Sequence, residues 1–214
     1  MSAKTDHKPN QQTSLRILQV VHGYPPHSNA GAEKYTRYLS QALAQQHNVN
    51  VLYVGDQGSH GEVVPVSEPF DEDIHEYTVN SARKTQRHIS KRAAVLRFET
   101  SYKRPDLNAG FTDLVDNLRP DIIHFQHVLT MSVDWLTIAT ERDYATILTL
   151  HDYWFNCPTI NLFQYTKQAC KGPEPTTCRT CWAHYRAQGL PYTNIQAVKA
   201  LTVSVLQALN PAQA

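Results

Sequence analysis

The first folded part of the chain alternates between apolar strands and an amphipathic helix. Arg16 to Val21 (RILQVV) and Val49 to Gly55 (VNVLYVG) are short runs rich in β-branched residues, and each predicts a strand. Between them, the spacing of apolar residues predicts a helix from about Glu33 to Gln46. Its sheet-facing stripe is predicted to consist of Ala32, Tyr35, Leu39, Ala42 and Leu43. A strand, a helix and a strand in this order predict a right-handed crossover and parallel pairing.

The alternation continues along the rest of the chain. Further strands are predicted at Glu76 to Ser81, Asp121 to Val128 and Thr146 to Leu150. Further helices are predicted in the second half of the basic segment Arg83 to Arg104, at Leu107 to Leu118, at Val133 to Arg142 and at Asn194 to Leu209. Glu62 to Asp73 and His151 to Gln188 have no clear period. We therefore expect an α/β fold, a Rossmann-like parallel sheet with helices on both faces, over residues 15–214 after a disordered tail at 1–14.

Composition narrows the class of protein. The 214 residues contain 20 Lys and Arg and 19 Asp and Glu. The net charge is therefore too small to favour nucleic acid as a partner. No apolar run approaches the ~20 residues of a membrane span, and the first 14 residues lack the apolar core of a secretion signal. These features predict a cytoplasmic protein. In that reducing compartment the four cysteines are expected to be thiols or metal ligands.

Polar side chains gather where the predicted strands end. His22 follows the first strand, His124 and Gln126 lie at the end of a later one, and His151 with Asp152 follows the last. Ligands of open parallel sheets bind beyond the carboxyl ends of the strands, which makes these residues site candidates. Before the first helix, the small residues Gly31 and Ala32 would let a phosphate approach unpaired N–H groups, although small residues also serve simply to turn a chain.

Three motifs together resemble the N-terminal domain of glycosyltransferase family 4. They are Tyr24-Pro25-Pro26-His27 through Ala30-Gly31-Ala32-Glu33, Asp121-Ile122-Ile123-His124, and Thr149-Leu150-His151-Asp152-Tyr153-Trp154. The resemblance covers about residues 15 to 190. It implies the N-terminal, acceptor-side half of a GT-B fold and a retaining transfer of sugar from a nucleotide-sugar donor, GDP- or UDP-linked. The acceptor would be a glycan or a lipid-linked molecule, as in polysaccharide or glycoconjugate biosynthesis, and no catalytic metal is expected.

Carried over residue by residue, the resemblance assigns roles to the candidates. The backbone around Gly31 and Ala32 would approach the donor diphosphate, and His151 would lie beside the transferred sugar as the catalytic residue. Residues expected to line the acceptor or sugar are His22, His124, Asp152 and Tyr153, with Trp154 as a further pocket candidate. Glu33 would be a structural cap that suits the helix dipole.

Two substitutions and one absence distinguish this chain from the family pattern. Ala30-Gly31 stands where the family usually has Gly-Gly, and Gln126 stands where a second His is common. The family also has a C-terminal donor domain with a pair of glutamates, and nothing after Leu209 would supply it. The chain alone is therefore expected to turn over little. The alternative function is a non-catalytic module that binds a glycan or a protein and holds a structural zinc ion.

Four cysteines lie in a Cys-rich insertion predicted at residues 154–188. Cys157, Cys170, Cys178 and Cys181 have the spacing C-x12-C-x7-C-x2-C. Four thiolates suit a closed tetrahedral zinc site, while buried free thiols and an iron–sulfur cluster or redox pair are the alternatives.

A basic run precedes the third predicted helix. It contains Arg83, Lys84, Arg87, Lys91, Arg92 and Arg97. Such a run is commonly a solvated helix face, but it also suits peripheral contact with the inner face of a membrane that carries a lipid-linked acceptor.

Overall fold

The structure is a computed structural model that describes residues 13–81, 102–157 and 159–187. These residues fall into two compact units. The first contains the described residues up to Ser81 together with Pro105–Thr149, and the second contains residues 102–104 and the described residues from Leu150 onward. The basic run and the helix predicted at Asn194 to Leu209 lie outside the described residues.

The first unit is built on one six-stranded sheet with the order β3-β4-β2-β1-β5-β6. Its strands are β1 (Arg16–Val20), β2 (Asn48–Gly55), β3 (Val63–Pro65), β4 (His75–Asn80), β5 (Ile122–Phe125) and β6 (Ala145–Leu148). All neighbours pair in parallel except β3, which pairs antiparallel with β4. The predicted strands are confirmed, and only the three-residue edge strand β3 was missed. The strand order reverses on either side of β1, which is the Rossmann-like arrangement.

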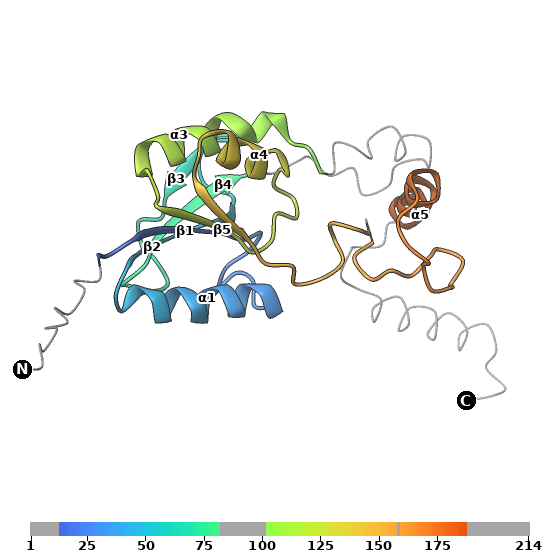
Figure 1. The fold of residues 1–214 in the computed structure, drawn as a ribbon, viewed down its shortest axis with the longest axis horizontal. Helices are drawn as coiled ribbons and strands as arrows, with labels where there is room; N and C mark the ends of the chain where they lie inside the picture. The colour runs from blue at the N-terminus through green and yellow to red at the C-terminus, as the bar shows by residue number, and fades with distance from the viewer. Residues whose placement is uncertain (1–12, 82–101, 158, 188–214) are drawn as a thin grey trace, which may run out of the picture. The chain divides into compact units, whose positions relative to one another are not determined.

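Helices cover both faces of this sheet, as predicted (Figure 1). α1 (Gly31–Ala44) lies on one face, and α3 (Asn108–Leu118) and α4 (Asp134–Glu141) lie on the other. The short 3-10 helix η2 (Pro105–Leu107) leads into α3. α3 ends at Arg119, whose left-handed φ of 46° stops the helix before Pro120. No helix in the described part of the chain combines the length and hydropathy needed to cross a bilayer.

The predicted sheet-facing stripe of α1 is wrong at Tyr35 and Ala42, although Leu43 packs against the core as predicted. The buried residues of this helix are Glu33, Thr36 and Ser40, whereas Tyr35 is 47% exposed and Ala42 is also exposed. The Thr36 hydroxyl donates to the Ala32 carbonyl at 2.7 Å, so its polar atom is satisfied within the helix.

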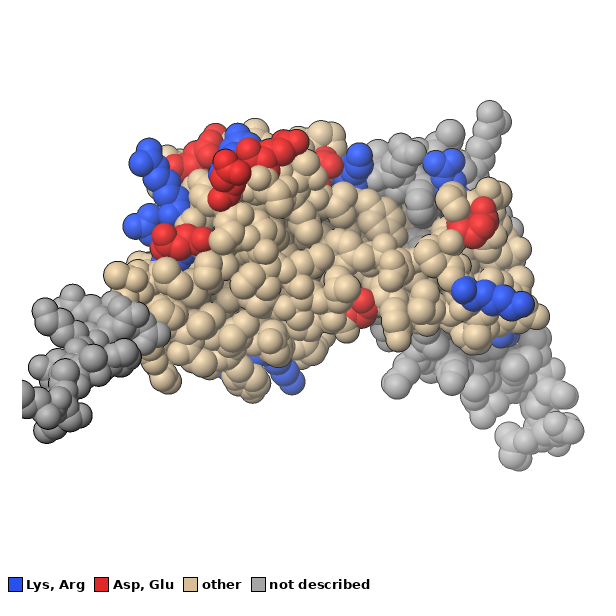
Figure 2. Space-filling view, in the orientation of Figure 1, with Lys and Arg blue, Asp and Glu red and all other residues tan. Residues whose placement is uncertain are grey.

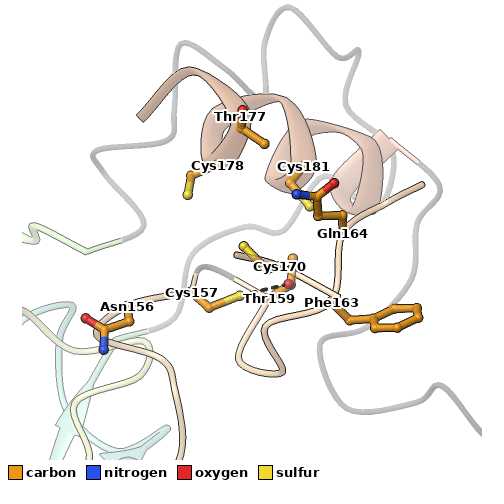
Figure 3. Close-up of a pocket in the computed structure, with 9 residues that line it drawn as sticks. All are labelled: Asn156, Cys157, Thr159, Phe163, Gln164, Cys170, Thr177, Cys178 and Cys181. Atoms are coloured by element: carbon orange, nitrogen blue, oxygen red, sulfur yellow. Dashed lines mark hydrogen bonds between the residues drawn. The ribbon is translucent and has the colours of Figure 1, made fainter. Parts of the chain in front are cut away.

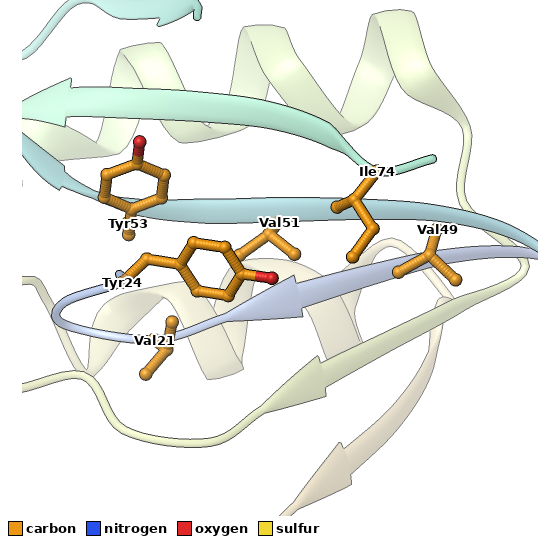
Figure 4. Packing of buried hydrophobic residues seen from close by; sticks show 6 residues of the cluster. All are labelled: Val21, Tyr24, Val49, Val51, Tyr53 and Ile74. Carbon is orange, nitrogen blue, oxygen red and sulfur yellow. The ribbon is translucent and has the colours of Figure 1, made fainter. Parts of the chain in front are cut away.

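An aromatic and aliphatic cluster forms the core next to α1 (Figure 4). Its buried members are Val21, Tyr24, Val49, Val51, Tyr53 and Ile74. The rings of Tyr24 and Tyr53 stack with centroids 5.5 Å apart. Leu43 and Ala44, from the last turn of α1, pack against the cluster. The Tyr hydroxyls bring polar atoms into this core, and both find carboxylate partners.

Two buried carboxylates link β4, the loop before it and α1. Glu76 accepts hydrogen bonds from the Phe70 and Asp71 N–H groups and, at 3.0 Å, from the Tyr53 hydroxyl. Asp71 in turn accepts from the Tyr24 hydroxyl, the Arg37 guanidinium and the Gln41 amide. Burial raises the pKa of Glu76. Burial also acts to raise the pKa of Asp71, but its hydrogen bonds from Arg37 and Tyr24 outweigh this, and the pKa is lowered.

The described residues of the second unit are irregular apart from one helix. α5 (Pro175–Ala187) follows a loop that contains a single bridge between Phe163 and Ala169. The sequence pattern did not predict α5, because its first turns are rich in Thr and Cys, which are weak helix formers. Its N-terminus nevertheless carries a start signal, with Pro175 at the first position and Glu174 accepting from the next two N–H groups. These hydrogen bonds from Thr177 and Thr176 lower the pKa of Glu174.

Candidate functional site

The candidate site of the first unit lies where the strand order reverses, at the carboxyl ends of β1 and β5. His22 leaves β1 and His127 leaves β5, and their rings lie 4.6 Å apart between centroids with an interplanar angle of 58°. His22 is partly exposed, whereas His127 is 4% exposed and accepts at Nδ1 from the Leu129 N–H. The buried ring therefore packs beneath the more accessible one, and His22 is the imidazole presented at this edge.

Glu33 from the first turn of α1 completes this group. Its Oε1 accepts from the Ser28 hydroxyl at 2.7 Å and lies 3.2 Å from His22 Nε2. The residue is 1% exposed, and its Oε2 has no hydrogen-bond partner among the described residues. A Cβ at Gly23 would come within 2.8 Å of Ser28 Cβ, so the glycine makes room for the contact. Glu33 is therefore not the simple dipole cap that the sequence predicted; it is a buried partner of His22.

Two glutamines and His124 form a second polar group across β1, β5 and the end of β6. Gln126 Nε2 donates to Gln19 Oε1 at 3.0 Å and lies 3.2 Å from the His124 ring. His124 Nε2 also contacts the Thr149 hydroxyl at 2.8 Å. Both glutamines are fully buried, and His124 is half-buried. The His124 ring is thus held in orientation by β5 and by the residue following β6.

The start of α1 presents backbone rather than side chains. Its N-cap residue Ala30 is extended, with φ −79° and ψ −171°, and makes no side-chain capping bond. A Cβ at Gly31 would meet no atom within 4 Å, so packing within the chain does not require a glycine there. The open space beside Gly31 and the uncapped first turn are compatible with a bound anion.

A larger cavity of this unit lies elsewhere and has the wrong charge for a phosphate ligand. It measures about 690 Å³ and lies among η2, α3 and β3. Its ionisable lining residues are His60, Glu62, Asp106 and Asp113. Figure 2 shows acidic side chains gathered over this α3 side of the sheet. An anionic donor would be repelled there, which favours the edge at β1 and β5 as the candidate site.

The motif that contains His151 belongs to the second unit. His151 is half-buried, and Tyr153 is 55% exposed. Asp152 Oδ1 accepts from the Trp154 N–H at 2.8 Å and thereby orders the turn that follows the histidine. Trp154 is 1% exposed and stacks on Tyr102 with centroids 4.8 Å apart. The interpretation of Trp154 as a pocket residue is therefore wrong, because its ring is used in packing.

The four cysteines meet in the same unit, as the proposed common site requires. All four are free thiols, and all line one small cavity (Figure 3). Burial raises the pKa of the Cys181 thiol, although the Tyr165 N–H donates to its sulfur at 3.2 Å. Within the described residues, no three His, Cys, Asp or Glu side chains already stand in a metal-binding arrangement.

Sequence reasoning missed the buried partners of the histidines. Gln19 is a polar residue inside the otherwise apolar run of β1, and such an interruption is a detectable signal. Ser28 carries no comparable signal, because a serine in a polar loop is ordinary. The inward turn of Glu33 depends on how α1 packs, and periodicity does not reveal that.

Comparison with known proteins gives one match. The family model described as Glycosyltransferase Family 4 matches residues 29–190, which include Glu33, His124, His151 and the four cysteines. No curated protein and no solved structure matches the chain.

Proposed function

Because the chain belongs to glycosyltransferase family 4, we propose that it contributes to a retaining transfer of sugar from a GDP- or UDP-linked donor to a glycan or lipid-linked acceptor. The observation that carries this proposal is the family match over residues 29–190 on a Rossmann-like sheet. The histidine and glutamate group at the β1 and β5 ends gives the proposal a specific location. The GT-B pairing of this unit with a donor domain is part of the same proposal.

Each part of the site is assigned one task. The N–H groups at Gly31 and Ala32 would bind the donor diphosphate, because the positive end of α1 stabilises the charge of the leaving group without a metal. His22 and His124 would line the site of the sugar or acceptor. His151 would lie next to the anomeric carbon, with Asp152 holding its turn and Tyr153 offering an exposed ring to the sugar.

Product stereochemistry tests the proposal. The full-length protein would be incubated with a panel of GDP- and UDP-sugars and with glycan and lipid-linked acceptors, and the anomeric configuration of the product would be followed by NMR. We expect one donor class to be consumed, with the configuration of its sugar retained. An inverted product would contradict the retaining mechanism, and no consumption of any donor would contradict the assigned reaction.

Glu33→Gln is expected to separate stability from activity. The glutamine keeps the volume of the side chain but removes a buried carboxylate whose Oε2 has no described partner, so stability should be unchanged or higher by about 1 kcal/mol. Loss of the His22 contact should lower kcat/KM about tenfold, a coupling of ~1.4 kcal/mol. Urea unfolding and steady-state kinetics on the full-length protein would measure the two effects.

Lys34→Gln is the matched control for this variant, because Lys34 is the exposed neighbour on the same helix. It should change neither quantity. If Glu33→Gln lowers stability and activity together, Glu33 acts only through folding and does not position His22.

A further inference from the structure

We infer that Cys157, Cys170, Cys178 and Cys181 form a structural site for a single zinc ion that joins α5 to the loop before it. The chain brings these thiols together from three places. Cys157 follows the turn after His151, and Cys170 directly follows the β-bridge between Phe163 and Ala169. Cys178 and Cys181 lie about one turn apart on α5. This inference does not depend on the proposed sugar transfer.

The cavity between these residues is small. It measures about 20 Å³, comparable to the space that a single water molecule occupies. Figure 3 shows the sulfur atoms of all four cysteines facing this common space. The four thiols therefore share one compact space that a single ion can occupy.

The chemistry of the lining is that of a thiolate site. Among the described residues, no His, Asp or Glu lines the cavity; its other lining residues are Asn156, Thr159, Phe163, Gln164 and Thr177. Four sulfur ligands with no competing carboxylate select zinc over magnesium or calcium. His184 is the nearest imidazole along α5, and its ring stacks on the Tyr165 ring with centroids 4.0 Å apart.

Hydrogen bonds to sulfur supply the supporting shell. The Tyr165 N–H donates to Cys181 Sγ at 3.2 Å, and the Thr159 hydroxyl lies 3.2 Å from Cys157 Sγ. Such contacts orient sulfur ligands and stabilise the negative charge they carry on a metal. Cys178 and Cys181 also lie on one face of α5 because they are three residues apart.

Binding needs only a local adjustment. The Cys170 thiol now donates to the Gly172 carbonyl at 3.1 Å, and no three of the described ligand types yet stand in a metal-binding arrangement. Rotation of cysteine side chains between staggered positions would bring the sulfurs to the Zn–S distance of about 2.3 Å. A metal cross-link is also what this unit lacks otherwise, because its loop contains only one β-bridge.

Metal content and a cobalt spectrum test the inference. The full chain, purified without added metal, is expected to contain about one zinc ion per chain, measured by elemental mass spectrometry. Replacement of zinc by Co²⁺ should produce the intense visible bands of a tetrahedral cobalt–thiolate centre. Cys181→Ser and Cys170→Ser should each lower the metal content at least about tenfold, since even changes around a ligand weaken metal sites by that factor. Cys170 is only half-buried, so its variant remains informative if Cys181→Ser fails to fold.

Thr177→Ala is the matched control, because Thr177 lines the cavity but has no sulfur. It should keep its zinc and its cobalt spectrum. The inference is overturned by a chain that takes up neither zinc nor cobalt, by iron bound together with sulfide, or by zinc that both cysteine variants retain.

Discussion

Replacing His151 with alanine is expected to lower kcat/KM for sugar transfer by about 10²- to 10⁴-fold, the contribution of a well-placed acid–base or hydrogen-bonding group. The residue follows β6, where ligands of parallel sheets bind, and the turn behind it is held by the Asp152 to Trp154 hydrogen bond. Steady-state kinetics of the full-length protein would measure the loss.

His75→Ala provides the comparison, because His75 is an exposed histidine at the start of β4, the opposite end of a strand from the site. It should keep activity within about twofold, as surface substitutions away from special features rarely matter. If His151→Ala is as active as His75→Ala, the role assigned to His151 is wrong.

The second large effect concerns stability. Asp71→Ala is expected to lower the free energy of unfolding by about 3 kcal/mol, because it removes one acceptor from three donors at once. The Tyr24 hydroxyl would lose its Asp71 acceptor, and Tyr24 is fully buried. Arg37, which also lies over the Phe70 ring at 4.7 Å, would lose its carboxylate partner. Urea unfolding followed by circular dichroism would give the change in midpoint at constant slope.

Glu72→Ala is the control for this variant, since the neighbouring Glu72 is exposed. Its free energy of unfolding should change by less than about 0.5 kcal/mol. A loss no larger than this in Asp71→Ala would show that the network does not hold the loop to α1.

The Asp71 contribution should also depend on pH in one direction. Its pKa in the folded protein is lowered, so its stabilisation is present above the ordinary Asp value of about 3.9 and is lost as pH falls through the folded pKa. Asp71→Asn should therefore be less stable than the wild type near neutral pH and approach it in strong acid. A constant difference over the whole acid range would contradict an ionic role for this carboxylate.

Sequence patterns predicted the sheet well because its central strands are short apolar runs. Gln19 did not disturb that prediction, since the other buried residues of β1 are apolar. The edge strand β3 has only three residues in an acidic, Pro-containing segment, too few for a period to appear. α1 was located within two residues, but its buried face was wrong, because Thr36 and Ser40 are buried through close packing rather than hydrophobicity.

The candidate site was predicted as a set of residue types at strand ends rather than as contacts. The strand ends pointed to His22 and His124, whose positions follow from parallel pairing, and their roles stay predictions. Glu33, the partner of His22, comes from a helix, and Gln19, the partner of Gln126 beside His124, comes from a neighbouring strand. Only the three-dimensional packing joins these residues. The convergence of the four cysteines likewise depends on α5, a helix that the sequence pattern did not indicate.

The pairing of β1 with β5 also has a consequence for the order of folding. The Arg16 N–H donates to the Asp121 carboxylate across 105 residues of sequence, whereas β1 meets β2 through one short helix. During synthesis His22, Ser28 and Glu33 are all made early. One edge of β1, however, stays unpaired until β5 has been made. Closing so long a loop is slow, and an unpaired strand edge invites wrong pairing meanwhile. The edge that we propose for catalysis is thus completed late, and we expect yields of folded protein to be sensitive to changes in β5.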